Sequence, residues 1–222
     1  MPSSGPYPET AISVDVVIFT IREGALQLLL AKRQRPPYEG MWALPGGMVE
    51  LQEDLDVSAF RHLREETGLT GVYLEQLYTF GNPTRDPRMR VVSVAYYALA
   101  SADRLSTGIN LDIERLRWFS FTMRPGLAFD HDAIVDIAHQ RLAAKLAYST
   151  IALQFLPEQF TLGDLQNVYE IILGRALDKR NFRKQVLALE QIEETGEERR
   201  NGNHRPARLY RMKWPGRVDV IK

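Results

Sequence analysis

The sequence of 222 residues contains no cysteine and carries no net formal charge. The absence of cysteine excludes disulfide bonds, thiolate nucleophiles and thiolate metal ligands. The longest apolar runs, such as VVIFTI and LQLLLA, are too short to cross a bilayer. The opening MPSSGPYPET lacks the basic and apolar regions of a signal peptide. We therefore expect a cytoplasmic protein with no membrane partner and a flexible tail over residues 1–10.

The zero net charge hides a basic segment near the end of the chain. Residues 1–149 hold 15 Lys or Arg and 18 Asp or Glu, whereas residues 150–222 hold 13 and 10. From Arg199 through Val218 there are seven basic residues and no acidic one. A local concentration of cations is the electrostatic signature of a surface that binds a polyanion. The neutral total therefore does not exclude a nucleic-acid partner.

The first two thirds of the chain mix strands with helices. AISVDVVIFTI and LQLLLAKR predict a hairpin, and GVYLEQLYTF, MRVVSVAYYALA and ERLRWFSF predict three further strands. EDLDVSAFRHLREETG predicts a helix with acidic residues in its first turn and Gly68 at its end, and DHDAIVDIAHQRLAAKLA predicts a second helix. The fold class expected for residues 11–148 is α/β (α+β), a sandwich built on a mixed sheet.

The pattern changes at Thr161. TLGD matches a capping box, and apolar residues follow at helical spacing through Ile172. Asp178 is a suitable N-cap for a second helix, KRNFRKQVLALEQI. EETGEERR and HRPARLYRM then predict two strands around an Asn201-Gly202 turn. Helix, turn, helix and hairpin in this order indicate a winged helix-turn-helix domain, for which we predict residues 149–222.

A spaced set of charged residues follows the first hairpin. After Gly47 come Glu53, Arg61, His62, Glu65 and Glu66. Positions 62, 65 and 66 fall on one face of a helix, so their side chains can converge on one ion. Carboxylates suit Mg²⁺, so Glu65 and Glu66 are the candidate metal ligands, whereas Glu53 and Arg61 suit an ion pair between loop and helix. A solvated acidic helix face is the alternative interpretation.

This spacing resembles the Nudix box, which has a glutamate where this chain has His62. The resemblance implies the Nudix fold and substrates in which a nucleoside diphosphate is linked to another group. It makes Glu53, Arg61, His62, Glu65 and Glu66 a vestigial catalytic set. Loss of a positioned base costs ~10² to 10⁴ in rate, so we expect weak hydrolysis or none. No cofactor is then required, and Mg²⁺ matters only if hydrolysis is retained; His62 itself is interpreted as an ordinary helix-surface histidine.

A cleft that has lost its chemistry can still bind a ligand. Gly46 and Gly47 allow the backbone to approach a phosphate, and Trp42 or the tyrosines of VAYYAL are candidates to stack on a base. Together with Glu65 and Glu66, Trp42 and the two glycines form the predicted effector site. Packing in the core is the alternative role for the aromatic side chains.

The second predicted helix of the C-terminal domain divides into an apolar stripe, which includes Phe182 and Val186, and a basic side, as recognition helices do. Wings of such domains contact phosphates or the minor groove. The predicted DNA-binding residues are Lys179, Arg180, Asn181, Arg183 and Lys184 in the helix and Arg199, Arg200, His204, Arg205 and Arg208 in the hairpin. The glutamates of EETGEE are expected to face away from DNA. An ordinary charged helix surface is the alternative.

The two halves together resemble the Nudix-related transcriptional regulators of NAD metabolism, the NrtR family. The similarity extends to FTLGDLQNVYEIILGRALDKRNFRKQVLALEQIEETGE, to RPARLYRM and to LAFDH at residues 127–131. It implies a homodimeric repressor that binds a palindromic double-stranded DNA operator near genes of NAD biosynthesis or salvage. It also implies that ADP-ribose or a related nucleotide, bound in the Nudix cleft, changes DNA affinity. We expect the linker at residues 147–159 to couple the two domains.

Two other functions remain open on the sequence. The first is an active Nudix hydrolase, an ADP-ribose or dinucleotide diphosphatase whose C-terminal domain serves for dimerisation. The second is a protein that binds RNA ends, which is the weaker alternative because winged helices usually read duplex DNA.

Overall fold

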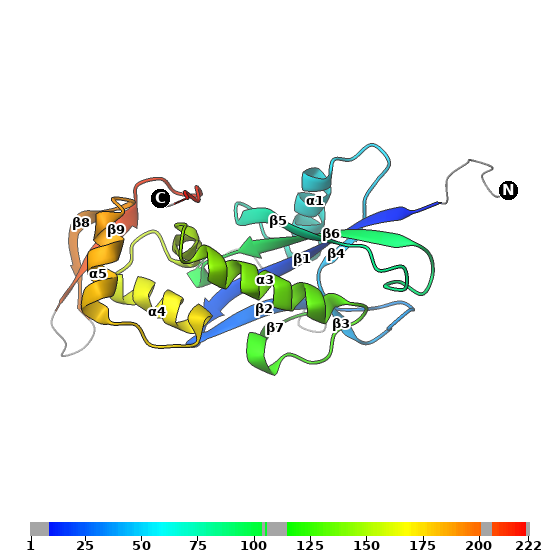
Figure 1. Cartoon of the computed structure of the whole chain (residues 1–222), viewed down its shortest axis with the longest axis horizontal. Helices are drawn as coiled ribbons and strands as arrows, with labels where there is room; N and C mark the ends of the chain where they lie inside the picture. Colours follow the sequence, from blue (N-terminus) through cyan, green and yellow to red (C-terminus); the bar gives the residue numbers. More distant parts are fainter. Residues whose placement is uncertain (1–8, 104, 106–114, 201–205, 221–222) are drawn as a thin grey trace.

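The computed structural model describes residues 9–103, 105, 115–200 and 206–220. Its first part is a mixed sheet between helices (Figure 1). The strands are β1 (Ala11–Arg22), β2 (Ala25–Lys32), β3 (Trp42–Ala43), β4 (Gly46–Met48), β5 (Tyr73–Phe80), β6 (Val91–Leu99) and β7 (Leu116–Ser120). The helices are α1 (Leu55–Thr67), the short 3-10 turn η1 (Phe121–Met123) and α3 (His131–Lys145).

Strand β1 is the centre of the sheet. The strand order is β3-β2-β1-β6-β5; β4 also pairs with β1 and β7 with β2. β1 runs antiparallel to β2 and parallel to β6, so the sheet is mixed as predicted. Because β4 pairs with β1, Gly46 lies opposite Asp15 and Gly47 lies opposite Val14.

Alternation along β1 places a helix on each face of the sheet. Val17 and Phe19 lie in the core that includes α3, whereas Val14, Val16 and Ile18 lie in the core that includes Ala59 and Leu63 of α1. Because successive strand residues point to opposite faces, a run of buried residues in β1 requires cover on both sides. The layers are helix, sheet and helix.

The C-terminal part is a winged helix domain, as the sequence predicted. It comprises η2 (Ile151–Phe155), α4 (Leu162–Leu173), α5 (Lys179–Ala188) and the hairpin β8 (Ile192–Arg199) with β9 (Ala207–Met212). Thr161 and Asp164 form the predicted capping box on α4, and Asp178 caps α5 through the backbone N–H of Asn181. These caps satisfy N–H groups that a helix leaves unbonded in its first turn.

Two expectations about this domain need comment. The helix predicted through Ile192 ends at Ala188, because Glu190 has a left-handed φ of 53° and Ile192 already pairs with Met212 in the hairpin. The predicted Asn201-Gly202 turn lies outside the described residues.

The segment predicted to be a linker is packed into the core. Ile151, Leu153 and Phe155 of η2 are buried, and the apolar cluster that contains them extends from Phe19 in the sheet to Phe182 in α5. The C-terminal end of the chain is bonded to this segment, since Thr150 and Asp219 exchange two hydrogen bonds. The domain boundary between residues 148 and 149 stays a prediction. No helix among the described residues is long and apolar enough to cross a membrane.

Candidate functional site

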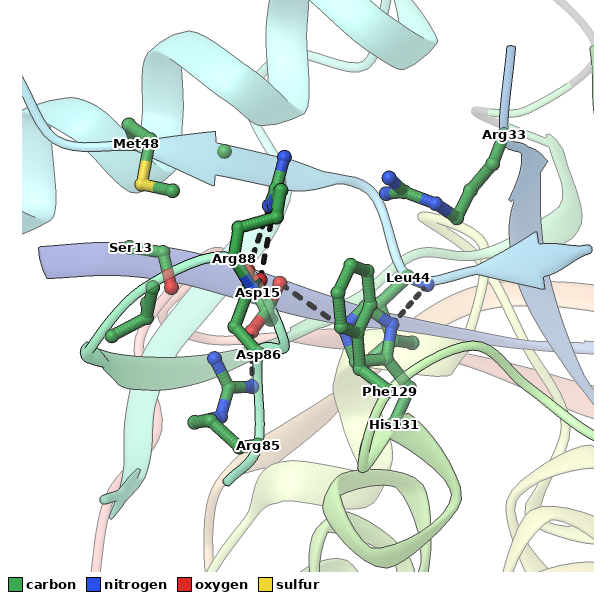
Figure 2. Close-up of a pocket in the computed structure, with 13 residues that line it drawn as sticks. Ser13, Asp15, Arg33, Leu44, Met48, Arg85, Asp86, Arg88, Phe129 and His131 are labelled. Carbon is green, nitrogen blue, oxygen red and sulfur yellow. Dashed lines mark hydrogen bonds and ion pairs between the residues drawn. The ribbon is translucent and has the colours of Figure 1, made fainter. Parts of the chain in front are cut away.

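A cleft of about 230 Å³ opens where β4, the loop after β5 and the start of α3 meet beside β1 (Figure 2). Three arginines, two aspartates and an aromatic side chain give it a mixed polar and apolar wall. The lining residues are Ser13, Asp15, Arg33, Leu44, Gly46, Gly47, Met48, Arg85, Asp86, Arg88, Val91, Phe129 and His131.

The arginines of the cleft are differently engaged. Arg85 is held between Asp15, at 3.2 Å, and Asp130, at 2.6 Å. Arg33 instead donates to the backbone carbonyls of Pro37 and Arg35, and its guanidinium lies 4.6 Å from the centre of the Phe129 ring. Burial lowers the pKa of Arg33, and the nearby Arg88 guanidinium adds to this effect. A guanidinium without a carboxylate partner is suited to bind an anion.

The inner wall of the cleft is fixed by His131. Its Nδ1 accepts a hydrogen bond of 2.9 Å from the Leu44 backbone N–H, so Nε2 carries the ring proton and faces Asp15 at 3.5 Å. Burial lowers the pKa of His131, which keeps the ring neutral. Nearby, the buried Ser13 hydroxyl has no hydrogen-bond partner in the described part of the chain. Since buried polar atoms usually have a partner, Ser13 is a candidate contact for a polar ligand.

Gly46 and Gly47, two residues of the predicted effector site, both line the cleft, and the backbone leaves no room for a side chain at Gly46. A Cβ at Gly46, where φ is 152°, would lie 2.2 Å from the Val14 carbonyl oxygen. A Cβ at Gly47 would lie 2.5 Å from Cε1 of His62. The Gly46 N–H donates to Oε1 of Glu66 at 3.0 Å, which joins the cleft to α1.

A second cavity, of about 440 Å³, lies on the other side of Gly46. It shares Arg33, Leu44 and Gly46 with the first, and Glu65 and Glu66 reach it from α1. The remaining lining residues are Ala31, Lys32, Gln34, Ala43, Arg115 and Leu116. The two cavities therefore adjoin at Gly46, and Arg33 lines both of them.

The ion pair predicted between loop and helix is confirmed. Nε and Nη2 of Arg61 donate to the two carboxylate oxygens of Glu53, each at 2.7 Å. This bidentate contact lowers the pKa of Glu53 to about 2. Glu65 also lies near Arg61, at 3.5 Å.

The interpretation of His62 as an ordinary surface histidine is wrong. Its side chain is only 14% exposed, its Nδ1 lies 3.4 Å from Oε1 of Glu66, and its Nε2 lies 3.2 Å from the Met48 carbonyl oxygen. The hydrogen bond with Glu66 raises the pKa of His62. His62 is therefore in contact with Glu66, one of the two candidate metal ligands. Among the described residues no group of three or more Asp, Glu, His or Cys is arranged to hold a metal ion.

The aromatic side chains proposed to stack on a base have other roles. Tyr96 and Tyr97 are buried in the core. Trp42 packs edge-on against Phe119, with ring centres 4.9 Å apart, and lines neither of the two cavities. Phe129 takes the place in the cleft wall that Trp42 was expected to have. Phe129 belongs to LAFDH, residues 127–131, one of the segments that resemble the NrtR family.

The predicted recognition helix presents a cationic surface. Phe182 and Val186 of α5 are buried, while Lys179, Arg180, Asn181, Arg183 and Lys184 are exposed. Within the described ranges no ion pair engages the four cations of this set. They are free to contact phosphates or base edges.

Two arginines of the wing, Arg199 and Arg208, are already paired. Arg199 contacts Asp164 of α4 at 2.5 Å, and Arg208 contacts Glu194 across the hairpin at 2.9 Å. Glu194 therefore forms an ion pair with Arg208 within the wing, whereas the sequence predicted only that it faces away from DNA. Arg200 is exposed. His204 and Arg205 lie outside the described residues.

Comparison with known proteins gives two domain matches. Residues 10–136 match the NUDIX domain, and residues 152–212 match the NrtR DNA-binding winged helix domain. A protein of Acinetobacter baylyi, the ADPR responsive transcriptional repressor NtrR, is 40% identical over 93% of this chain and 83% of its own length.

Two crystal structures from Shewanella oneidensis are also similar. NrtR complexed with a 27mer DNA is 36% identical, covers 91% of this chain and 93% of its own, and has a TM-score of 0.84. The NUDIX domain of NrtR complexed with ADP ribose is 33% identical, covers 63% of this chain and 94% of its own, and has a TM-score of 0.55. The similarity thus extends over both domains of the chain.

Proposed function

We propose that this chain, which belongs to the NrtR family of Nudix-related transcriptional regulators, is a repressor whose affinity for DNA depends on a nucleotide bound in its Nudix domain. The observation that carries the proposal is the cationic face of α5, which forms no ion pair within the described residues, in a winged helix domain joined to an arginine-lined cleft. A Nudix hydrolase does not need such a helix.

The proposed effector is ADP-ribose or a related nucleoside diphosphate. Its diphosphate would lie along Gly46 and Gly47, near Arg33, because these residues allow close approach and supply a guanidinium without a carboxylate partner. Phe129 offers a ring face, and the Ser13 hydroxyl offers a hydrogen bond, on the same wall. The predicted contributions of Glu65 and Glu66 are retained, since both line the adjoining cavity.

The proposed DNA partner is a palindromic operator bound by a homodimer. A dimer of winged helix domains presents two recognition helices, so its operator repeats with the symmetry of the protein. Lys179, Arg180, Asn181, Arg183 and Lys184 would lie in the major groove. The wing residues Arg199, Arg200, His204, Arg205 and Arg208 remain the proposed phosphate contacts. Family membership supports genes of NAD biosynthesis or salvage as targets and a cytoplasmic location.

The direct test is a fluorescence anisotropy titration of the protein with its own upstream DNA, with and without saturating ADP-ribose. We expect specific binding, with a dissociation constant that ADP-ribose changes by about fivefold or more. A scrambled duplex of equal length is the control. Equal affinity for both duplexes, or no effect of ADP-ribose, would contradict the proposal.

An active hydrolase is a second candidate because the Glu53–Arg61 ion pair is present, with Glu65 close to Arg61. Against it, His62 engages Glu66, so the carboxylate cluster is not open to an ion. Turnover of ADP-ribose with Mg²⁺ at ordinary enzyme rates, without operator binding, would favour the hydrolase.

A further inference from the structure

Helix α3 lies along the sheet and extends towards α4 of the winged helix domain (Figure 1). At its start, Asp130 accepts two hydrogen bonds from Arg85, and His131 forms part of the cleft wall. The helix then runs 15 residues along the sheet, a length of about 22 Å, and its far end packs against α4. One rigid element therefore contacts both the candidate effector site and the DNA-binding domain.

The contact between α3 and α4 is made through His139. Its Nε2–H donates to the carbonyl of Ile172 at 3.1 Å, and its ring stacks on Phe121 with centres 4.3 Å apart. Ile172 lies in the last turn of α4, where carbonyl groups have no partner within the helix. His139 supplies that partner from the other domain, so its side chain fixes the end of α4 relative to α3.

Open grooves lie on both sides of this contact. A cavity of about 320 Å³ lies beside His139 and the end of α4, and one of about 430 Å³ separates Ala143 and Leu146 of α3 from Phe182 and Val186 of α5. Close-packed interfaces resist small displacements, whereas a contact bounded by unfilled space can tilt. The arrangement leaves room for the winged helix domain to change its angle to α3.

We propose that α3 transmits occupancy of the cleft to the recognition helix and that His139 is the positioning residue that selects the angle of the winged helix domain. The inference rests on the proposed function. A diphosphate in the cleft competes with Asp130 for Arg85, which changes what holds the first turn of α3. A ligand shifts a conformational equilibrium only through such a difference in contacts. The coupling element is then α3, not the packed segment at residues 147–159.

The test compares His139→Ala, His139→Gln and the control Gln140→Ala, an exposed change on the next residue of α3. For each variant the dissociation constant for operator DNA is measured with and without saturating ADP-ribose, and the ADP-ribose dissociation constant is measured without DNA. The ratio of the two DNA values is the coupling factor, which is typically about fivefold or more in allosteric proteins.

We expect His139→Ala to reduce the coupling factor to within about twofold of unity while ADP-ribose affinity changes less than about twofold. His139→Gln should restore most of the coupling because its amide N–H reaches the same carbonyl, and Gln140→Ala should match the wild type. A purely structural role would lower both affinities and leave the coupling factor unchanged. That result, or an unchanged coupling factor with both affinities intact, would overturn the inference.

A change at the other end of α3 provides an independent test. Asp130→Asn weakens the hold on Arg85, so ligand-free DNA affinity should move towards that of wild-type protein saturated with ADP-ribose. A ligand-free affinity equal to wild type would count against α3 as the transmitter. If wild-type protein itself shows no response to ADP-ribose, the proposed function fails, and this inference fails with it; a responsive wild type with an equally responsive His139→Ala overturns the inference alone.

Discussion

The cationic face of α5 allows a quantitative prediction for the double substitution Arg180→Gln and Arg183→Gln. Both side chains are exposed, and neither has a carboxylate partner among the described residues. Each phosphate that a cation neutralises contributes about 0.9 to the slope of log K against log salt. If each of these two major-groove arginines neutralises one phosphate at the groove edge, the double substitution lowers the slope by about 1.8 per subunit, or about 3.6 in a dimer. Between about 50 and about 200 mM NaCl this removes a ~150-fold change in affinity.

The assay is anisotropy of labelled operator DNA at five or more salt concentrations in this range, with thermal melting to show that the fold is intact. Arg64→Gln, which removes one exposed arginine from α1 of the Nudix domain, is the control for loss of positive charge outside α5 and should leave the slope unchanged. A slope for the double variant within about 0.9 of the wild-type value would refute the assignment of α5 as the DNA-contacting helix.

Three further predictions concern the Nudix domain. Because Arg61 lowers the pKa of Glu53 to about 2, the ionised carboxylate stabilises the fold above about pH 4.5, and this contribution is lost as the pH falls towards 2. The melting temperature of Glu53→Gln should therefore be lower than that of wild type at neutral pH, and the two should converge in acid. Gly46→Ala should cost at least about 2 kcal/mol in urea unfolding, because its Cβ meets backbone, whereas Gly24→Ala, in open space, should cost about 1 kcal/mol. His62→Glu should raise Mg²⁺-dependent hydrolysis of ADP-ribose by ~10²-fold, measured as the rate of AMP release. No gain in rate would mean that more of the cleft than one carboxylate has diverged.

Local signals in the sequence predicted most of the fold. The capping residues Thr161 and Asp178 mark helix starts that the structure retains, because each cap depends on residues only three positions away. The end of α5 was missed because it depends on the hairpin: Ile192 is buried as a strand residue paired with Met212, and that pairing overrides the helical pattern of the preceding residues.

The cleft was only partly predictable for a related reason. Gly47 was predictable because it begins a motif with fixed spacing, and Gly46 because a glycine beside it lets the backbone approach a phosphate. Arg33, Arg85 and His131 were not, since they are brought together by the pairing of distant strands and by the start of α3. A periodic pattern within a short stretch of sequence does not predict contacts between residues that are far apart in the chain. His62 shows the same limit, because its contact with the Met48 carbonyl exists only once β4 lies beside α1.

The paired arginines of the wing affect how tightly the protein holds DNA that is not its operator. Asp164 and Glu194 act as internal counterions for Arg199 and Arg208, and a DNA phosphate has to displace a carboxylate before it gains the guanidinium. Exchange of a carboxylate for a phosphate releases fewer counterions than binding by unpaired cations does. Paired arginines therefore contribute less to non-specific DNA binding. The cations of α5, which form no ion pair within the described residues, therefore bind DNA without first breaking an internal contact, whereas Arg199 and Arg208 do not.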